Sequence, residues 1–150
     1  MLEFIGDKVL DFIVVKLLAE RFGFMISECD DFNKDEDWDE FACEKSEAQL
    51  TEIKKRLVQK KTLAERIDAL GFADYLIMGK GDIRQNADKE DSVKEDLFEA
   101  ILGAIAIDSN WNIEKLQIVV EIMLNPECFT ECRKVESLFK SPVRYLYFIT

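Results

Sequence analysis

The stretch that decides the fold is Val93-Lys-Glu-Asp-Leu-Phe-Glu-Ala-Ile-Leu-Gly-Ala-Ile-Ala-Ile-Asp108. It is strongly apolar, and four small residues in it allow neighbouring elements to approach closely. These are Ala100, Gly103, Ala104 and Ala106. The segment is therefore predicted to form a central helix packed on several neighbours. The acidic residues Asp96 and Glu99 are unusual in such surroundings.

More helices are predicted on both sides of this segment. Residues 2–22 repeat apolar side chains at close to the 3.6-residue period of a helix, and Gly23 is a plausible stop. Ser46 followed by Gln49 is typical of a capping box that starts a helix. The predicted helices beyond Gly23 span residues 46–63, 62–70, 93–107 and 112–124. Only two prolines and six glycines occur in 150 residues, which disfavours a sandwich of short strands. The chain is predicted to be all-α.

The charge is unevenly distributed along the chain. The formal net charge is −11, which disfavours a polyanionic partner. Residues 28–47, however, hold ten acids and two bases, whereas residues 54–66 hold six bases and one acid. Residues 28–45 are predicted to form a long, acidic, exposed loop. A basic helix follows it.

Several classes of protein are disfavoured. No run of 18 uncharged apolar residues exists, so neither a membrane span nor a signal peptide is predicted, and a cytoplasmic location is expected. The four cysteines lack the paired C-x2-C spacing of a zinc site, and there is no histidine to complete one.

Two pairs of carboxylates lie on the predicted helices. Glu3 and Asp7 are four residues apart, and Asp96 and Glu99 are three apart, so each pair projects from one helix face. If the two faces meet, four carboxylates would form a site for Mg²⁺, which prefers oxygen ligands. Acids at this spacing are also common on solvated helix faces, so the spacing alone leaves both readings open.

The motifs resemble one known family. The opening Leu2-Glu-Phe-Ile-Gly-Asp-Lys-Val-Leu10 is similar to the signature of the ribonuclease III family, L-E-F-L-G-D-x-V-L. The stretch Lys61-Thr-Leu-Ala-Glu-Arg-Ile-Asp-Ala-Leu-Gly71, followed by Asp74-Tyr-Leu-Ile-Met-Gly-Lys-Gly81, looks like the family's middle segment. The run Asp96-Leu-Phe-Glu-Ala-Ile-Leu-Gly-Ala-Ile-Ala-Ile-Asp108 resembles its second acidic motif. The three motifs occur in the family's order.

The resemblance implies an all-α, ribonuclease III endonuclease-domain-like fold that homodimerises partly through the signature helix. It implies a site for Mg²⁺, for which Mn²⁺ could substitute. The implied metal ligands are Glu3, Asp7, Asp96 and Glu99, with Asp7 and Glu99 as the catalytic residues. Glu47 matches a position where the family often has an acid, and is expected to be an auxiliary acidic residue.

The implied function is hydrolysis of phosphodiester bonds in double-stranded RNA, as in RNA processing, by a water that the magnesium ion activates. Such an enzyme reads duplex RNA by its shape and backbone. The residues expected to contact that backbone are Lys54, Lys55, Arg56, Lys60 and Lys61. Their alternative is an ordinary solvated helix face.

The resemblance also suggests how the chain is divided. Residues 1–138 are expected to form the catalytic domain, without the helices that precede the signature in the family. Residues 139–150 resemble the start of the double-stranded-RNA-binding domain that commonly follows. The chain is therefore expected to be a fragment of a longer protein.

Two other functions stay open at this point. One is a non-catalytic ribonuclease III-like module that binds RNA or associates with the ribosome, which the acidic balance favours. The other is an all-helical magnesium-dependent nucleotide pyrophosphohydrolase, which also carries paired acids on helices but does not explain the three motifs.

Overall fold

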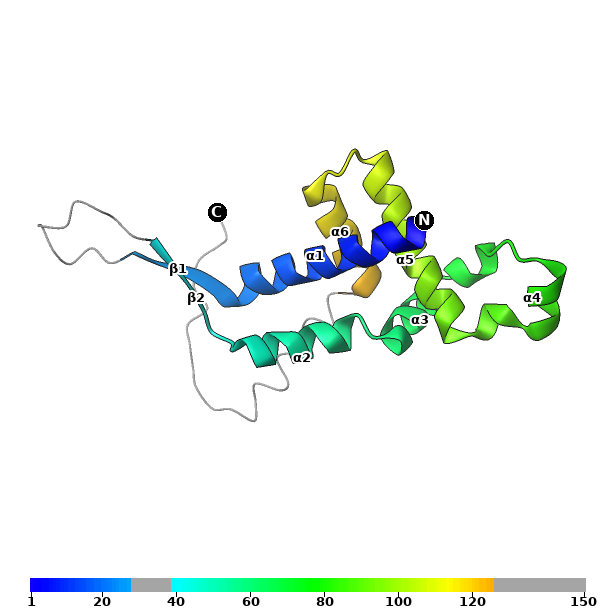
Figure 1. Cartoon of the computed structure of the whole chain (residues 1–150), viewed down its shortest axis with the longest axis horizontal. Helices are drawn as coiled ribbons and strands as arrows, with labels where there is room; N and C mark the ends of the chain where they lie inside the picture. Colours follow the sequence, from blue (N-terminus) through cyan, green and yellow to red (C-terminus); the bar gives the residue numbers. More distant parts are fainter. Residues whose placement is uncertain (28–38, 126–150) are drawn as a thin grey trace, which may run out of the picture.

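The computed structural model of the chain describes residues 1–27 and 39–125. In chain order its elements are α1 (Leu2–Phe22), β1 (Gly23–Ser27), β2 (Asp39–Cys43), α2 (Glu47–Leu57), α3 (Lys60–Ala69), the 3-10 helix η1 (Phe72–Tyr75), α4 (Lys80–Gln85), the 3-10 helix η2 (Ala87–Lys89), α5 (Asp91–Asp108) and α6 (Ile113–Leu124). The all-helical prediction is confirmed, apart from one small hairpin. Figure 1 shows α1 along the long axis, with the hairpin at its C-terminal end and α2 beside it.

Helix α1 has the bounds that its apolar period predicted. It buries a stripe that includes Leu10, Ile13 and Val14, and Ile13 and Val14 are fully inaccessible to solvent. The helix ends at Gly23, as predicted, but the glycine continues into strand β1 with an extended backbone. A side chain at Gly23 would overlap the Phe41 ring and the Ala19 carbonyl oxygen, so the lack of a side chain allows this close approach.

Helix α5 is the central helix that the apolar stretch predicted. It contacts α1, α3 and α6, and its residues Phe98, Leu102 and Ala106 are fully buried. Burying a large apolar side chain contributes roughly 1.5–3 kcal/mol, so this helix forms the middle of the core. Lys94 is also buried in it, and its ammonium binds the Asp68 carboxylate of α3 at 2.6 Å.

The predicted helix over residues 46–63 is divided in two. The capping box is confirmed: the Gln49 backbone N–H donates to Ser46 Oγ at 3.3 Å, and the Ser46 N–H donates to Gln49 Oε1 at 2.9 Å. Helix α2 nevertheless ends at Leu57, and α3 begins at Lys60. The Thr62 hydroxyl donates to the Arg56 carbonyl oxygen at 3.0 Å and so satisfies one acceptor at the end of α2.

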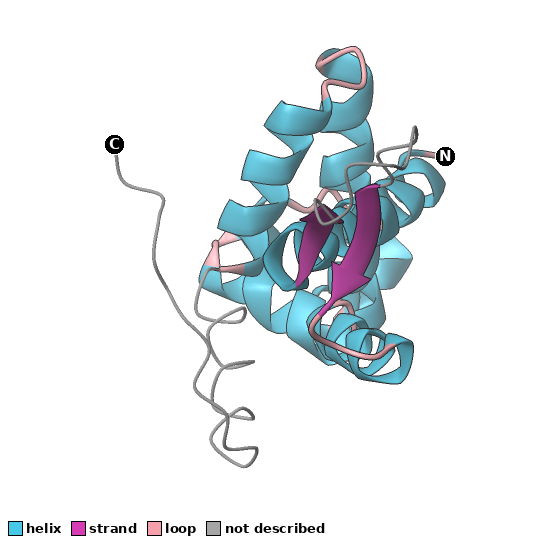
Figure 2. Ribbon diagram, turned by 90° about the vertical axis from the view of Figure 1, so that its left-hand side faces the viewer, coloured by secondary structure: helices cyan, strands magenta, loops and turns pink. Residues whose placement is uncertain are grey.

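Two segments of the structure differ from the prediction. Residues 39–43 belong to β2, which pairs with β1 in an antiparallel hairpin that aligns Met25 with Phe41. Figure 2, which is viewed from the left-hand side of Figure 1, shows these strands in front of the helices. Residues 82–92 lie outside the predicted helices, yet they hold most of α4, all of η2 and the start of α5. A left-handed backbone at Asn86 separates α4 from η2.

Helix α6 completes the described part of the chain with nearly its predicted bounds. The expected domain boundary at residue 138 and the segment 139–150 lie outside the described residues, as do residues 28–38 of the predicted acidic loop. No helix among the described residues is both long and apolar enough to cross a membrane.

Candidate metal centre

Three of the predicted ligands lie together where α1 meets α5. Glu3 comes from the first turn of α1, and Asp96 and Glu99 come from the N-terminal half of α5. One carboxylate oxygen of each lies within 4.8 Å of the others. Glu3 and Asp96 are exposed and Glu99 is half-buried, so the cluster opens to solvent on one side.

Two glycines allow the helices to approach this closely. A side chain at Gly6 of α1 would overlap the backbone carbonyl of Glu99, and one at Gly103 of α5 would overlap the carbonyl of Leu2. Each helix therefore contacts the other by its backbone. Glu3 and Glu99 are brought together because no side chain separates their helices.

The cluster gathers several negative charges around Glu99. The pKa of Glu99 is raised from 4.5 to about 7, first because the carboxyl is partly removed from water and then by the charges of Asp7, Glu95, Asp96 and Glu3. Like charges that accumulate in a partly desolvated place are costly without a counter-ion.

The fourth predicted ligand lies beside the cluster. Asp7 is one turn from Glu3 on α1, and its charge is the strongest of those that act on Glu99. It is not among the three carboxylates that share the 4.8 Å sphere. Its Oδ2 instead accepts from the ammonium of Lys8 at 2.7 Å.

The donors suit a hard divalent cation. They are carboxylate oxygens, the ligands that Mg²⁺ and similar ions prefer. The pKa of Glu99 is raised by its partial removal from water and then by negative charge, and such an ion would compensate that charge. The adjacent Glu95 is different, because Lys60 already neutralises it at 2.9 Å. Glu3, Asp96 and Glu99 could therefore hold a metal ion, with Asp7 within electrostatic reach.

Glu47 lies far from this cluster in the same chain. It begins α2, three residues after Glu44, whose N–H donates to the Phe22 carbonyl oxygen at the C-terminal end of α1. Glu3 is at the other end of that helix, and a helix of this length extends about 30 Å. Figure 1 shows the same separation between the start of α2 and the N-terminus. The auxiliary role of Glu47 stays a prediction.

The five predicted RNA-binding bases differ in their surroundings. Lys54 binds Asp11 of α1 at 2.6 Å, and Lys60 binds Glu95 of α5. Arg56 and Lys61 pair with acids one turn away on their own helices. Lys55 is exposed and makes no ion pair within residues 1–27 and 39–125. The pairs of Lys54 and Lys60 bring two of these bases next to the carboxylates, because Asp11 is one turn from Asp7 and Glu95 precedes Asp96.

Sequence reasoning missed two features around the centre. The first is that two ion pairs join α3 to α5. Lys60 of α3 binds Glu95 of α5, and Asp68 of α3 binds Lys94 of α5. The isolated lysine Lys94 in an apolar helix was the signal for it.

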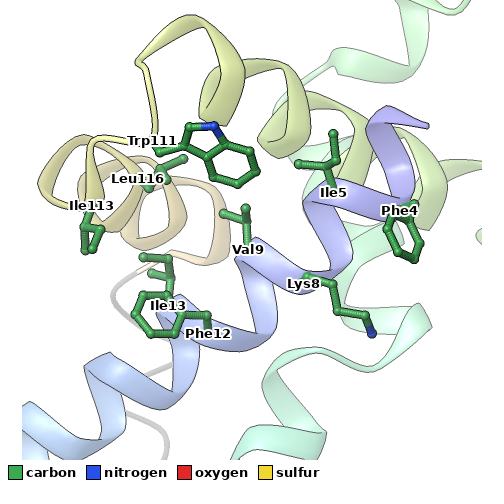
Figure 3. Close-up of a pocket in the computed structure, with 9 residues that line it drawn as sticks. All are labelled: Phe4, Ile5, Lys8, Val9, Phe12, Ile13, Trp111, Ile113 and Leu116. Carbon is green, nitrogen blue, oxygen red and sulfur yellow. The ribbon is translucent and has the colours of Figure 1, made fainter.

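The second feature that sequence reasoning missed is an apolar groove of about 370 Å³ between α1 and the start of α6. The nine lining residues are Phe4, Ile5, Lys8, Val9, Phe12, Ile13, Trp111, Ile113 and Leu116 (Figure 3). Phe4 and Phe12 are 66% and 55% exposed, which is unusual for large apolar side chains on one helix face.

Comparison with known proteins gives one consistent result. The model of the ribonuclease III domain family matches residues 1–110. A protein of Roseburia hominis named Ribonuclease 3 is 58% identical over 129 residues, which cover 84% of this chain and 36% of that protein. A Ribonuclease 3 of Treponema succinifaciens is 42% identical over 127 residues, 85% of this chain and 31% of that protein. The chain thus spans about a third of the length of these relatives.

A solved structure agrees with these relatives. The nuclease domain of ribonuclease III from Campylobacter jejuni, described as structurally flexible in a region involved in dimer formation, is similar with a TM-score of 0.62. It is 26% identical, and the match covers 85% of this chain and 73% of that one. Three sequence motifs, the helical fold and the clustered carboxylates agree with these likenesses, and the chain belongs to the ribonuclease III domain family.

Proposed function

We propose that this chain is the catalytic domain of a magnesium-dependent endoribonuclease that hydrolyses double-stranded RNA. The observation that carries the proposal is the convergence of Glu3, Asp96 and Glu99, with Asp7 beside them, in a member of this family. Glu3, Asp7, Asp96 and Glu99 would hold the ion. When bound, Mg²⁺ supplies activation of water and compensates negative charge on the reacting phosphodiester.

The residues of the chain have separate tasks in this mechanism. Asp7 and Glu99 are the proposed catalytic pair, because Asp7 is the acid whose charge acts most strongly on Glu99. For Glu99 to act as a ligand it must lose its proton, which its raised pKa opposes and a nearby cation favours. Ion pairs that fix α5 to α3, including Lys94 with Asp68, keep Asp96 and Glu99 facing α1.

Duplex RNA is the proposed substrate because the centre is open and has basic side chains nearby. Lys54 and Lys60 lie beside the carboxylates, and Lys55 and Lys61 are exposed on the same consecutive helices. Together with Arg56, these bases supply the positive charge that contact with a phosphate backbone requires. Because the net charge of the chain is strongly negative, RNA binding requires this local group of bases and bound cations.

A homodimer through the signature helix is also proposed. The groove along α1, flanked by the exposed Phe4 and Phe12, leaves apolar surface that a second copy would cover. The expected test is the molecular mass in solution: the parent should dimerise, and Phe12→Glu should be monomeric at the same concentration while keeping its helical circular dichroism. A monomeric parent would reject this assembly.

A cytoplasmic location stays a prediction.

The nuclease proposal is tested by cleavage of duplex RNA with and without Mg²⁺. The parent should cleave only with the ion, and Glu99→Gln should reduce cleavage by at least about a hundredfold, because a ligand and its charge are lost. Asp108→Asn, which removes an exposed carboxylate from the far end of the same helix, is the matched control and should cleave like the parent.

The same assay separates the alternatives. A folded parent that binds duplex RNA without cleaving it would favour the non-catalytic module. Hydrolysis of nucleoside triphosphates in preference to RNA would favour the pyrophosphohydrolase, which the family membership already disfavours.

A further inference from the structure

Lys8 is the single charged residue among the nine that line the apolar groove. Its stem lies between Phe4 and Phe12, which are one turn away on either side along α1. Figure 3 shows its ammonium pointing away from Trp111 and Leu116. Lysines commonly lie this way, with the stem on apolar neighbours and the charge in solvent. The groove therefore uses the stem and not the ammonium.

The ammonium binds the predicted metal ligand next to it in sequence. Lys8 Nζ lies 2.7 Å from Asp7 Oδ2. Successive helical residues point about 100° apart, so this pair forms only because both side chains bend toward each other. The other acid nearby on α1, Asp11, is already bound by Lys54 at 2.6 Å. The Asp7 carboxylate is thus bound to Lys8 and lies outside the cluster formed by the carboxylates of Glu3, Asp96 and Glu99.

We propose that Lys8 is a positioning residue that holds Asp7 outside the carboxylate cluster until a divalent cation binds, and that its released ammonium then binds an RNA phosphate. The inference rests on the proposed metal-dependent function and assigns an order to it. Asp7 is shared between two cationic partners, and the RNA gains a contact only after the metal centre is complete.

The exposure of the pair makes this exchange feasible. The side chains of Lys8 and Asp7 are 69% and 46% exposed, and ion pairs in such positions contribute little net stability. A divalent cation among Glu3, Asp96 and Glu99 attracts Asp7 more strongly than one ammonium does. Once Asp7 has turned to the ion, Lys8 stands at the rim of an open centre, where a phosphate can act as its counter-ion.

The first measurement is the Mg²⁺ concentration that gives half of the thermal stabilisation. Lys8→Met keeps an unbranched apolar stem for the groove and removes the charge. It should lower this midpoint by a factor of about 1.5 to 5, the range that corresponds to a surface ion pair. Lys8→Arg should stay close to the parent. Lys16→Met is the matched control, since Lys16 pairs with Glu20 on the same helix, and its midpoint should not change.

The second measurement is the salt dependence of duplex-RNA affinity in Mg²⁺. It uses proteins that keep all four carboxylates, and binding is read by rapid mixing before cleavage occurs. Loss of one phosphate contact should make the slope of log affinity against log salt less negative by about 1 for Lys8→Met. Lys8→Arg should keep the parent slope.

The outcomes are distinguishable from those of the proposed function. A parent that does not respond to Mg²⁺ rejects the metal centre itself. A parent that responds, with an unchanged or higher midpoint for Lys8→Met, overturns the role of Lys8 in holding Asp7. An unchanged salt slope overturns its contact with phosphate. If none of the proteins binds duplex RNA, the RNA function is rejected. The role of Lys8 in holding Asp7 is then tested by the Mg²⁺ dependence of the melting temperature alone.

Discussion

The α-carbon of Gly6 faces the backbone carbonyl of Glu99 so closely that no side chain fits between them. The contact joins α1 and α5, two helices that are far apart in the sequence, and lies within one turn of Glu3. Closeness at this point sets the distance between the carboxylates of the two helices. The geometry of the centre therefore depends on a residue that has no side chain.

Gly6→Ala is expected to destabilise the chain by roughly 1–3 kcal/mol, the usual cost of forcing extra volume into a packed contact. In an open helix position the same change would stabilise by about 0.5–1 kcal/mol. Gly81→Ala in α4 is the matched control, because a side chain there meets nothing within 4 Å. Urea denaturation of the three proteins checks the sign, and equal stability of Gly6→Ala and the parent would contradict the contact.

The raised pKa of Glu99 predicts how stability depends on pH without metal. Below pH 4.5 the carboxyl is protonated in both the folded and the unfolded chain and has no effect. As the pH rises toward 7, the unfolded chain releases this proton while the folded chain retains it, so folding loses stability. Glu99→Gln should lack this loss, and in chelator its melting temperature relative to the parent should rise between about pH 4.5 and 7. A difference that does not vary with pH would contradict the shift.

Magnesium is expected to raise the melting temperature of the parent. An ion that binds only the folded chain stabilises it by roughly 2.7 kcal/mol at 100 times its dissociation constant. Asp96→Asn, which removes one of the three clustered carboxylates, should reduce the effect. Asp108→Asn at the far end of α5 should not. Identical melting curves with chelator and with millimolar Mg²⁺ would show that the ion does not bind here.

Lys55→Ala is expected to weaken duplex-RNA binding more than Lys54→Ala does. The Lys54 ammonium is engaged by Asp11, whereas Lys55 has no such partner among residues 1–27 and 39–125 and can give its charge to a phosphate. The salt slope should become less negative by about 1 for Lys55→Ala. Equal effects of the two substitutions would mean that the bases act only through the overall charge of this surface and not through separate phosphate contacts.

The helices and the acidic pairs were predictable from the sequence because both depend on local spacing. The apolar period of α1 and the capping box at Ser46 are visible within one or two turns. Proximity of Glu3 to Glu99 is a tertiary property, and only the motifs of the family suggested it.

The hairpin and the partner of Lys94 could not be predicted by the same reasoning. Strands β1 and β2 are separated by residues 28–38, so no tight-turn sequence indicates their pairing. Their cross-strand partners Met25 and Phe41 are both exposed, so no buried face marks the strands in the sequence. A lysine in an apolar helix signals that Lys94 has a charged partner, but the sequence does not identify Asp68, 26 positions earlier, as that partner.

The joining of α1 to α5 also fixes an order in time. Ribosomes release a chain from its N-terminus, so the first turn of α1 emerges long before Glu99, with more than 90 positions between Glu3 and Glu99. Contacts between such distant segments form late, because a large loop must close first. A nascent chain therefore holds half of the ligand set without a competent centre, and any nuclease activity begins only after α5 has been synthesised and has docked on α1.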